Sequence, residues 1–239
     1  MQPAQIAFEF IECCRGEPSL GTVLRELSRC TGLFGFDSFM LTGLPWPHER
    51  FERHVLLNGW SEEWYERFTR RDYFHLDCVG QWALRTCMPF THVEIPDALR
   101  RNPAASRIRA EAKAFGFADG LVVPIRSAWW RQSAVSFSCD RHCDLGPHER
   151  SALHLVAIYA EATVRESLAK TTASEKLTAR EREVLAWAAQ GKSAWETSVI
   201  LSLSERTVTK HLEHVRAKLN VATTAQAVAE GFRIGEIAL

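Results

Sequence analysis

Apolar residues recur at helical spacing at the start of the chain and then give way to strand-like runs. In residues 4–30 they fall three and four positions apart, which predicts two helices separated by a Gly-Glu-Pro break at residues 16–18. Residues 33–44 are rich in aromatic side chains and are bounded by glycine and proline, and residues 51–57 form a second apolar run. We expect a strand in each.

A helix with a strongly aromatic face follows. Ser61 precedes two glutamates and marks a helix start, and we expect the helix to reach about Arg71. Trp60, Trp64 and Phe68 are four residues apart and therefore share one face of it.

The rest of the N-terminal part alternates between strand and helix signals. The expected elements are a helix capped by Asp77 and running through Cys87, a short strand at 89–94, a helix from Pro103 to Phe115, strands at 120–126 and 133–139, and a helix from Pro147 to about Lys170. This order fits a sheet with helices over both faces. Residues 169–176 contain no large apolar side chain, so we interpret them as a linker.

The C-terminal part carries three helix-start signals in succession. Thr178 with Glu181 forms a capping box, and Gly191 ends the helix that it begins. Ser193 with Glu196 repeats the box for a short second helix to about residue 201. A third helix to Leu219 is capped by Ser202 with Glu205, or by Ser204 alone.

The third of these helices has two contrasting faces. Apolar side chains recur at Val208, Leu212, Val215 and Leu219 and must face a core. The opposite face carries polar and basic residues, namely Arg206, Thr209, Lys210, Glu213 and Arg216, together with Ala217. Two short helices with a tight turn and such a second helix predict a helix-turn-helix, whose second helix enters a DNA major groove.

The pattern as a whole predicts an α+β protein. We expect an N-terminal α/β/α sandwich around a mainly antiparallel sheet in residues 1–168, a linker at 169–176, and an all-α, four-helix helix-turn-helix domain in residues 177–239.

The charge of the chain is balanced overall, and basic residues are in clear excess only in one short C-terminal segment. The 239 residues include 29 basic and 29 acidic ones, so the whole chain has no net attraction for nucleic acid or membrane. Residues 177–239 hold eight basic and seven acidic residues, a net charge of +1, although residues 205–218 hold four basic against two acidic. A three-helix interaction module with solvated charges is therefore an alternative to a DNA-binding domain.

Weak charge also favours a dimer, since phosphate neutralisation supplies much of the affinity for DNA. The candidate dimer element is the helix from Pro147, with apolar side chains at Leu153, Leu155, Val156, Ile158 and Tyr159.

Cysteine usage and hydropathy indicate a cytoplasmic protein. The seven cysteines are odd in number and scattered, the N-terminus has no basic stretch before an apolar core, and no apolar run reaches 18 residues. We therefore expect free thiols and no membrane partner. Cys139 and Cys143 with His142 and His148 have zinc-like spacing, but no second pair stands at a matching distance. We expect no metal, no cofactor and no enzymatic activity, because no catalytic motif is present.

We expect the N-terminal half to bind the signal that controls DNA binding by the C-terminal part. This half lacks the βα alternation of a phosphoacceptor domain. It does place Trp64 and Asp77 among many aromatic residues, and an apolar cavity with a few aimed polar groups binds a small amphiphile. The indole offers a donor and the carboxylate offers acceptors. The alternative is a filled aromatic core in which Asp77 only caps a helix.

The C-terminal segment resembles the DNA-binding domain of LuxR-type transcription factors. The resemblance is carried by Leu-Thr-x-Arg-Glu-x-Glu-Val-Leu at 177–185, Gly191-Lys192-Ser193, Ser204-x-x-Thr207-Val208-x-x-His211 and Lys218-Leu219. It implies that Arg206, Thr209 and Glu213 read bases, while Lys192, Thr207, Lys210 and Arg216 hold phosphates. The chain departs from the family at Thr224, where Arg is usual, and at the unusually large Trp195.

The N-terminal part looks like the autoinducer-binding domain of the same quorum-sensing family, whose members bind N-acyl-homoserine lactones. The pattern is Trp64-x3-Phe68-x8-Asp77, followed by Pro89-Phe90, Gly116, Gly120 and Pro124. By resemblance, Trp64 donates to the lactone carbonyl, Asp77 accepts from the amide N–H, and Ser136 binds the acyl carbonyl. Trp60 and Phe68 wall the pocket.

Four departures from this family pattern concern the ligand. Trp60 and Phe68 stand where tyrosine is usual, Cys78 where proline is usual, and His92 where a pocket tryptophan is usual. The resemblance implies a homodimer that binds an acyl- or aryl-homoserine lactone autoinducer and a pseudo-palindromic promoter site in double-stranded DNA. The alternatives are an orphan regulator that responds to a non-lactone small molecule, and a ligand-independent DNA-binding or adaptor protein.

Overall fold

The computed structural model describes residues 2–126, 132–171 and 177–237. These residues form two compact units, one containing residues 2–126 and 132–171 and the other containing residues 177–237. The helix α7 (Pro147–Thr171) includes the first three residues of the expected linker, and residues 172–176 lie outside the described ranges.

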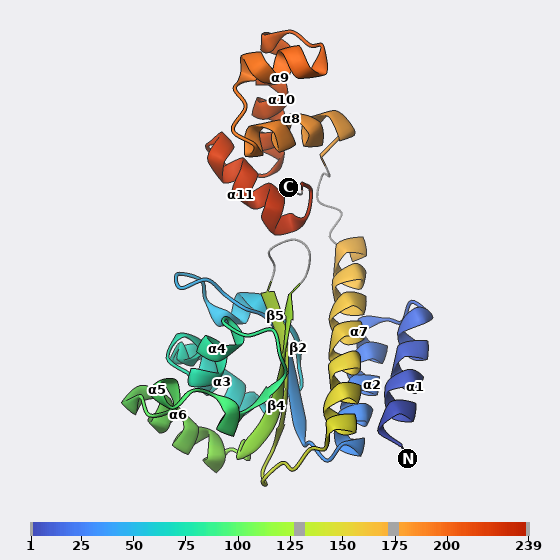
Figure 1. Ribbon diagram of the computed structural model, residues 1–239, viewed down its shortest axis with the longest axis vertical. Helices are drawn as coiled ribbons and strands as arrows, with labels where there is room; N and C mark the ends of the chain where they lie inside the picture. The colour runs from blue at the N-terminus through green and yellow to red at the C-terminus, as the bar shows by residue number, and fades with distance from the viewer. Residues whose placement is uncertain (1, 127–131, 172–176, 238–239) are drawn as a thin grey trace. The chain divides into compact units, whose positions relative to one another are not determined.

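The first unit is built around a five-stranded sheet. Its strands are β1 (Ser38–Gly43), β2 (Val55–Asn58), β3 (Phe90–Thr91), β4 (Asp119–Arg126) and β5 (Gln132–Cys139). They lie in the order β2-β1-β5-β4-β3, and every neighbouring pair is antiparallel (Figure 1). The α+β class with an antiparallel sheet is thus confirmed.

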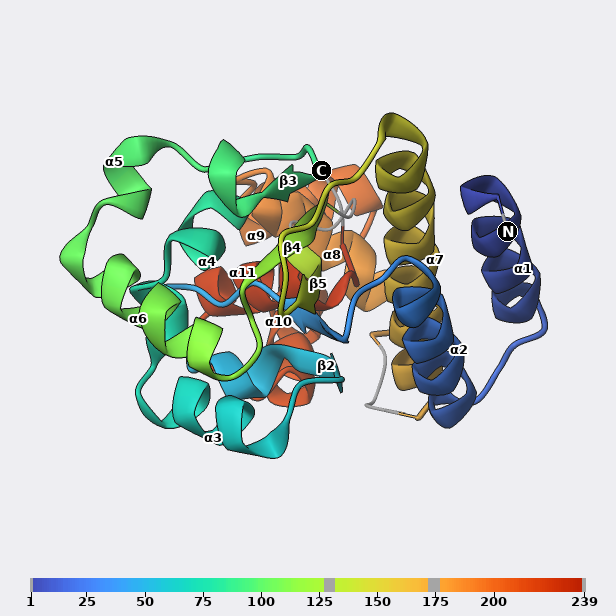
Figure 2. The same cartoon turned by 90° about the horizontal axis from the view of Figure 1, so that it is seen from below.

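One face of the sheet is covered by α2 (Leu20–Leu33) and α7, and α1 (Pro3–Arg15) packs on these two helices on the side away from the sheet (Figure 2). Large side chains from alternate strand positions, such as Leu121, Val135 and Phe137, pack against these helices and are fully buried. We call this side the packed face.

The other face is covered by short helices and turns: α3 (Glu62–Arg70), α4 (Cys78–Ala83), α5 (Asp97–Arg100), α6 (Pro103–Ala114) and the 3-10 turns Phe51–His54, Tyr73–His75 and His92–Glu94. A second apolar cluster lies here, dominated by aromatic rings such as Phe51, Trp64 and Phe74. We call this side the cavity face.

Several sequence-based boundaries are wrong on the cavity face. Residues 51–54 form a 3-10 turn rather than a strand, because Phe51 is drawn into the aromatic cluster and buried. Only two residues of the expected strand at 89–94 pair with β4, since Thr91 and Glu94 form a capping box that starts a 3-10 turn. The short helix α5 was not expected.

Two further boundaries differ from those expected from the sequence, because of local interactions. The expected strand at 33–44 begins only at Ser38, because α2 continues to Leu33 and Gly35 turns the chain with a φ of 82°. The helix capped by Asp77 ends at Ala83 rather than at Cys87. After it, the backbone N–H of Met88 donates to the Thr86 hydroxyl.

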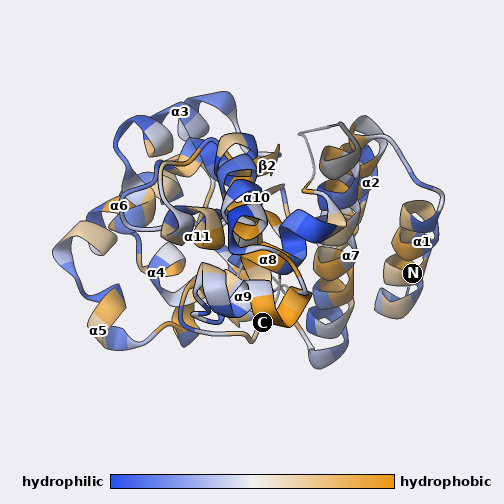
Figure 3. Ribbon diagram, turned by 90° about the horizontal axis from the view of Figure 1, so that it is seen from above, coloured by the Kyte–Doolittle hydropathy of each residue, from blue (hydrophilic) through white to orange (hydrophobic). Residues whose placement is uncertain are grey.

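The helix α7 buries part of the surface that the sequence offered for dimerisation. Leu153 and Val156 are fully buried against the packed face, so they are not available to a second chain. Leu155 and Ile158 are each 39% exposed, and Tyr159 is half-buried. The apolar bands along α7 are visible in Figure 3.

The second unit consists of α8 (Ala179–Ala189), α9 (Ala194–Leu201), α10 (Glu205–Lys218) and α11 (Thr224–Ile234). The caps predicted at Thr178 and Ser193 are present, and each accepts from the backbone N–H three residues later. Of the two alternatives for the third helix, Ser204 is the cap, whereas Ser202 ends α9. Gly191 follows α8 with a φ of 80°, in the left-handed region that ends helices.

A small core and one buried ion pair hold these helices together. Leu177, Leu185, Val215, Ala227 and Ile237 form the buried centre. The Glu181 carboxylate, 5% exposed, accepts from Lys218 Nζ at 2.8 Å and also closes the cap at Thr178. None of the helices in the described ranges combines the length and apolarity needed to cross a membrane.

Candidate functional site

A cavity of about 130 Å³ lies on the cavity face of the sheet, and small side chains on the strands leave the room for it. Its floor includes Ala134, Ser136 and Ser138 from alternate positions of β5 and Gly120 from β4. Gly120 is required there, since a Cβ atom would lie 2.2 Å from the Phe137 carbonyl oxygen.

Aromatic rings form the walls and fix one another by edge and tilted contacts. The ring centroids of Trp60 and Phe68 are 5.2 Å apart in a T-shaped contact. The ring centroid of Phe117 lies 5.4 Å from that of Trp60 and 5.7 Å from that of Trp64. Because each ring touches several others, their orientation is set before any ligand arrives.

One indole N–H group of this wall lacks an acceptor. The Trp60 Nε1 atom is buried and has no hydrogen-bond partner among the described residues. The neighbouring Trp64 is 2% exposed. A buried donor without a partner costs free energy, so the Trp60 N–H is suited to an acceptor on a ligand.

Asp77 both caps a helix and lines the cavity. Its Oδ1 atom accepts from the Val79 backbone N–H at 3.3 Å, as the first turn of α4 requires. Burial raises the pKa of Asp77 to about 6, although this hydrogen bond and the charge of Arg109 act in the opposite direction. Asp77 therefore occupies both of the places considered from the sequence, because it caps a helix and lines the cavity.

His92 lines the same cavity beside Cys78. Its Nε2 atom lies 3.8 Å from Cys78 Sγ. Burial, reinforced by the positive charges of Arg109 and Arg100, lowers the pKa of His92 to about 4, so the ring is neutral at neutral pH. Burial also raises the pKa of the Cys78 thiol to about 12, which keeps it protonated.

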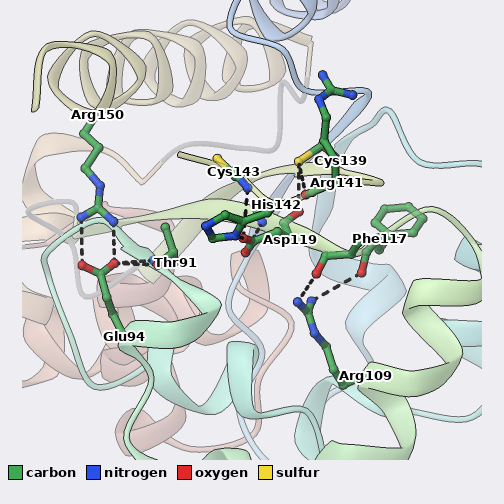
Figure 4. Close-up of polar contacts among 12 residues, drawn as sticks. Thr91, Glu94, Arg109, Phe117, Asp119, Cys139, Arg141, His142, Cys143 and Arg150 are labelled. Carbon is green, nitrogen blue, oxygen red and sulfur yellow. Dashed lines mark hydrogen bonds and ion pairs between the residues drawn. The ribbon is translucent and has the colours of Figure 1, made fainter. Parts of the chain in front are cut away.

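Arg109 is a cavity residue that the sequence did not indicate as functional. It reaches from α6 to the chain before β4, where its guanidinium donates to the carbonyls of Phe117, at 3.4 Å, and Ala118 (Figure 4). A signal for it exists in the sequence. Arg109 falls between the buried Ala105, Ile108 and Ala112, at a helical position where a charged side chain is unusual.

Asp119 borders the cavity with its carboxylate already occupied. Oδ2 accepts from His142 Nδ1 at 2.8 Å and from the Cys143 backbone N–H at 3.2 Å, and Oδ1 accepts from the Gly120 N–H at 2.9 Å (Figure 4). His142, considered above for its zinc-like spacing, is therefore held by a carboxylate at the start of β4.

The structure brings all six predicted ligand-binding residues around this one cavity. They are Trp60, Trp64, Phe68, Asp77, His92 and Ser136. Their contacts with a ligand stay predictions. Sequence patterns did not single out Met40, Arg109 or Phe117, which complete the lining and come from other elements.

The candidate DNA-reading surface is the outer face of α10. Arg206, Thr209, Lys210 and Glu213 are exposed along it. Lys192 is also exposed, before the first turn of α9, with Nζ 3.7 Å from a Glu196 carboxylate oxygen.

Two of the predicted phosphate contacts have a second role. Thr207 is half-buried and its hydroxyl lies 2.8 Å from the Ser204 hydroxyl at the cap. Arg216 is half-buried and donates to the Thr224 hydroxyl at 3.3 Å, which ties α10 to α11. Thr224 is the position where the sequence departs from the LuxR pattern, so the departure supplies a contact within the domain.

Comparison with known proteins identifies the family of both domains. Residues 19–164 match the family model described as an autoinducer binding domain, and residues 175–230 match the one described as bacterial regulatory proteins, luxR family. The chain belongs to the LuxR family of transcriptional regulators. It carries the autoinducer-binding and DNA-binding domains of that family, which is one of regulators and not of enzymes.

Relatives of this LuxR-family chain match it along nearly its whole length. The transcriptional activator protein BjaR1 of Bradyrhizobium diazoefficiens is 36% identical over 228 residues, covering 95% of this chain and 94% of its own. The quorum sensing-dependent regulator RpaR of Rhodopseudomonas palustris is 36% identical over 206 residues, covering 86% and 84%. A structure of SdiA has the same fold, with a TM-score of 0.78 at 19% identity over 94% of this chain and 92% of that one.

Proposed function

We propose that this LuxR-family regulator binds an N-acyl- or aryl-homoserine lactone in its cavity and a pseudo-palindromic promoter site as a homodimer. The proposed domains are residues 1–168 for ligand binding and dimerisation and residues 177–239 for DNA binding, joined by the linker 169–176. The observation that supports the ligand half is an aromatic cavity in whose wall the Trp60 Nε1 atom is buried and has no hydrogen-bond partner among the described residues.

The polar groups of the cavity complement an acylated homoserine lactone. Trp64 donates to the lactone carbonyl, Asp77 accepts from the amide N–H, and Ser136 binds the acyl carbonyl. Trp60 adds an indole donor where the family usually has a tyrosine, so the hydroxyl lost at this position is replaced by an N–H. Each polar atom of the ligand then meets a group of opposite hydrogen-bonding character.

The size of the cavity favours a short or flat tail. Ligand pockets commonly measure about 300–1,000 Å³, and this cavity of about 130 Å³ is well below that range. Its walls are aromatic rings, including Trp60 and Phe68, which pack well against a planar aryl group. A short acyl chain or an aryl group fits these walls better than a long alkyl chain.

In the proposed DNA-binding domain, α10 enters the major groove of the promoter site. Arg206, Thr209 and Glu213 read bases, and Lys192, Thr207, Lys210 and Arg216 hold phosphates. The net charge of +1 on residues 177–239 favours two copies on the DNA, since one copy neutralises few phosphates. The exposed Leu155 and Ile158 of α7 are the proposed dimer contacts.

A mismatch panel tests the assignment of roles on DNA. Arg206→Ala removes a bidentate contact to guanine, so it lowers discrimination at one base pair by about 1–3 kcal/mol. Lys192→Ala weakens binding to all sequences by a similar factor and reduces the salt dependence. Gel-shift titrations on single-base variants of the promoter site measure both, and equal behaviour of the two variants contradicts the assignment.

The alternative function is a regulator that responds to a non-lactone molecule. The neutral His92 and the cationic Arg109 make part of the cavity more polar than an acyl-lactone requires. The solved SdiA structure with a similar fold is described as a complex with octanoyl-rac-glycerol, so that protein accommodates a ligand without a lactone ring.

Ligand extraction tests the function directly. Organic extracts of the purified full-length chain, analysed by mass spectrometry, should contain an acylated homoserine derivative, and added lactone should raise the melting temperature. Asp77→Asn should abolish that shift. Glu66→Gln, the same chemical change on the exposed side of α3, is the matched control and should retain it. Empty extracts and no shift with any ligand favour a ligand-independent DNA-binding protein.

A further inference from the structure

The basic side chains described in the second unit fall into two groups. Those of the first group contact another side chain of the unit, either a glutamate or, in one case, a hydroxyl: Arg180, Arg182, Lys192, Lys218 and Arg216. Arg206 and Lys210 form the second group. They are exposed on α10 and make no hydrogen bond or ion pair among the residues that the structure describes. Their charges are therefore available to a partner of the protein.

His214 continues the line of these two cations along α10. It follows Lys210 by four positions, as Lys210 follows Arg206, so the three side chains share one face of the helix. The His214 side chain is exposed and, like the other two, contacts no side chain in the described part of the chain. A protonated imidazole at this position makes a third cation on the same face.

The second histidine of α10 has a different place. His211 comes three positions after Val208 and four before Val215, and both valines are fully buried in the second unit. His211 is accordingly half-buried, toward the core side of the helix. Of the two histidines, His214 is the one that lies in line with the exposed cations.

The position of His214 along α10 fits the DNA backbone better than the bases. In a helix-turn-helix the N-terminal residues of the second helix contact the base edges. His214 is eight residues beyond Arg206, which is about 12 Å further along the axis. The major groove is itself about 12 Å wide. With Arg206 at the bases, His214 therefore reaches the phosphates that border the groove.

The charged groups around His214 leave it open to such a phosphate. On α10, Lys210 and Lys218 lie one turn before and one turn after it, and Glu213 precedes it. Glu213 stands in line with Thr209 rather than with Lys210. The described ionisable side chains of the helices that pack against α10 have interactions of their own: Arg180, Glu181, Arg182 and Glu183 of α8, Glu196 of α9, and Glu230 of α11.

We propose that His214 binds a DNA phosphate in its protonated form, so that DNA binding takes up a proton and becomes stronger as the pH falls. An imidazole N–H donates to a phosphate oxygen, and the proton that charges the ring comes from the solvent. This inference rests on the proposed function, in which α10 enters the major groove, and it adds a residue and a pH dependence to that surface.

The sign follows from the charge of the phosphate. A histidine ordinarily has a pKa of about 6.5, and an adjacent anion raises the pKa. The extra affinity is fully present below the pKa of the free protein and is lost as the pH rises through the higher pKa of the complex. Because residues 177–239 have a net charge of only +1 without their histidines, one added cation is a large share of the charge that meets the DNA.

The test uses the purified full-length chain and a fluorescently labelled DNA duplex of random sequence. A phosphate contact is independent of sequence, so the promoter site is not needed. Fluorescence anisotropy should show binding about threefold tighter or more at about pH 6 than at about pH 8. The slope of log affinity against log salt concentration should be steeper at the lower pH, by about one for each copy bound.

Variants locate the effect at His214. His214→Gln should remove most of the difference between the two pH values. His214→Lys carries a fixed charge and should bind at the higher pH as tightly as the wild type binds at the lower one, a rescue that a purely structural role does not predict. His148→Gln, the same change at an exposed histidine in the first turn of α7, is the matched control and should keep the wild-type pH dependence.

The outcomes separate this inference from the proposed function. If His214→Gln keeps the wild-type pH dependence, or if His211→Gln alone removes it, the role of His214 is wrong and DNA binding through α10 stands. Lys210→Gln tests that surface itself and should weaken binding at both pH values. If Lys210→Gln and His214→Gln both bind the duplex as the wild type does, α10 is not the DNA-binding surface, and the proposed function fails together with this inference.

Discussion

The two faces of the sheet are built from the same strands but differ in the size of the side chains that they bury. On the packed face, β5 presents Val135 and Phe137, both fully buried against α2 and α7. On the cavity face, the alternate positions of the same strand are Ala134, Ser136 and Ser138. The strand therefore alternates large and small side chains, and the small ones leave a hollow that the short helices above it do not fill.

The faces also differ in how their buried polar groups are paired. On the packed face the Glu161 carboxylate, 6% exposed, accepts from the Ser133 hydroxyl at 2.9 Å and pairs with Arg165. On the cavity face, the buried Trp60 Nε1 atom has no hydrogen-bond partner among the residues that the structure describes. Buried polar groups are normally satisfied. The difference indicates that one face is complete by itself and the other is completed by a ligand.

The largest expected effect is on the packed face. Phe137→Ala removes a fully buried ring and leaves a void among large neighbours, which should cost about 3–5 kcal/mol of unfolding free energy. Urea unfolding followed by tryptophan fluorescence measures the cost. A loss below 1 kcal/mol would show that this face is as loosely packed as the other.

The second effect is a pair of opposite pH dependences on the cavity face. The pKa of Asp77 is raised to about 6, so the folded state binds a proton that the unfolded state releases, and stability should fall as pH rises from about 4 to about 6. The pKa of His92 is lowered to about 4, so stability should rise over the same window. In the wild type the two contributions largely cancel.

Single substitutions should expose each slope. Asp77→Asn leaves the His92 contribution, so the unfolding free energy should increase with pH by up to about 1.4 kcal/mol per unit. His92→Gln leaves the Asp77 contribution and should give the reverse sign. Melting temperatures recorded between pH 4 and pH 6.5 provide the comparison, and slopes of the same sign in both variants would rule out this account of the two groups.

A third test uses two serines on one strand that point to opposite faces. Ser133→Ala removes the donor of the buried Glu161 and should cost about 1–3 kcal/mol. Ser136→Ala removes a hydroxyl that faces the cavity and should change stability by less than about 0.5 kcal/mol while it weakens ligand binding. Chemical denaturation and ligand titration of both variants check the contrast, which an equal loss of stability would remove.

Local signals predicted much of this structure. The capping pairs at Thr178 and Ser193 and the cap at Ser204 placed the helices of the second unit, because the interactions that begin a helix lie within four residues. Aromatic spacing at Trp60, Trp64 and Phe68 correctly indicated one shared face.

Other features depend on contacts between distant segments and could not be predicted from the sequence alone. Residues 51–54 coil because Phe51 enters a cluster with Phe74 and Phe68, which lie 17 or more positions further along the chain. Arg109 interrupts a buried face of α6, but its sequence position does not show that its guanidinium reaches the carbonyls of Phe117 and Ala118 just before β4. The unpaired state of the Trp60 indole likewise depends on all the walls together.

The central claim is that a ligand completes the cavity face, and filling the cavity tests it most directly. Ser136→Leu places an isobutyl group on the cavity floor, where the wild type has a hydroxymethyl group. Titration calorimetry compares this variant with the wild type, using the tightest binder from a panel of N-acyl- and aryl-homoserine lactones. We predict that the variant melts at or above the temperature of the free wild type and binds the ligand at least 100-fold more weakly. A folded Ser136→Leu variant with wild-type affinity would contradict the claim.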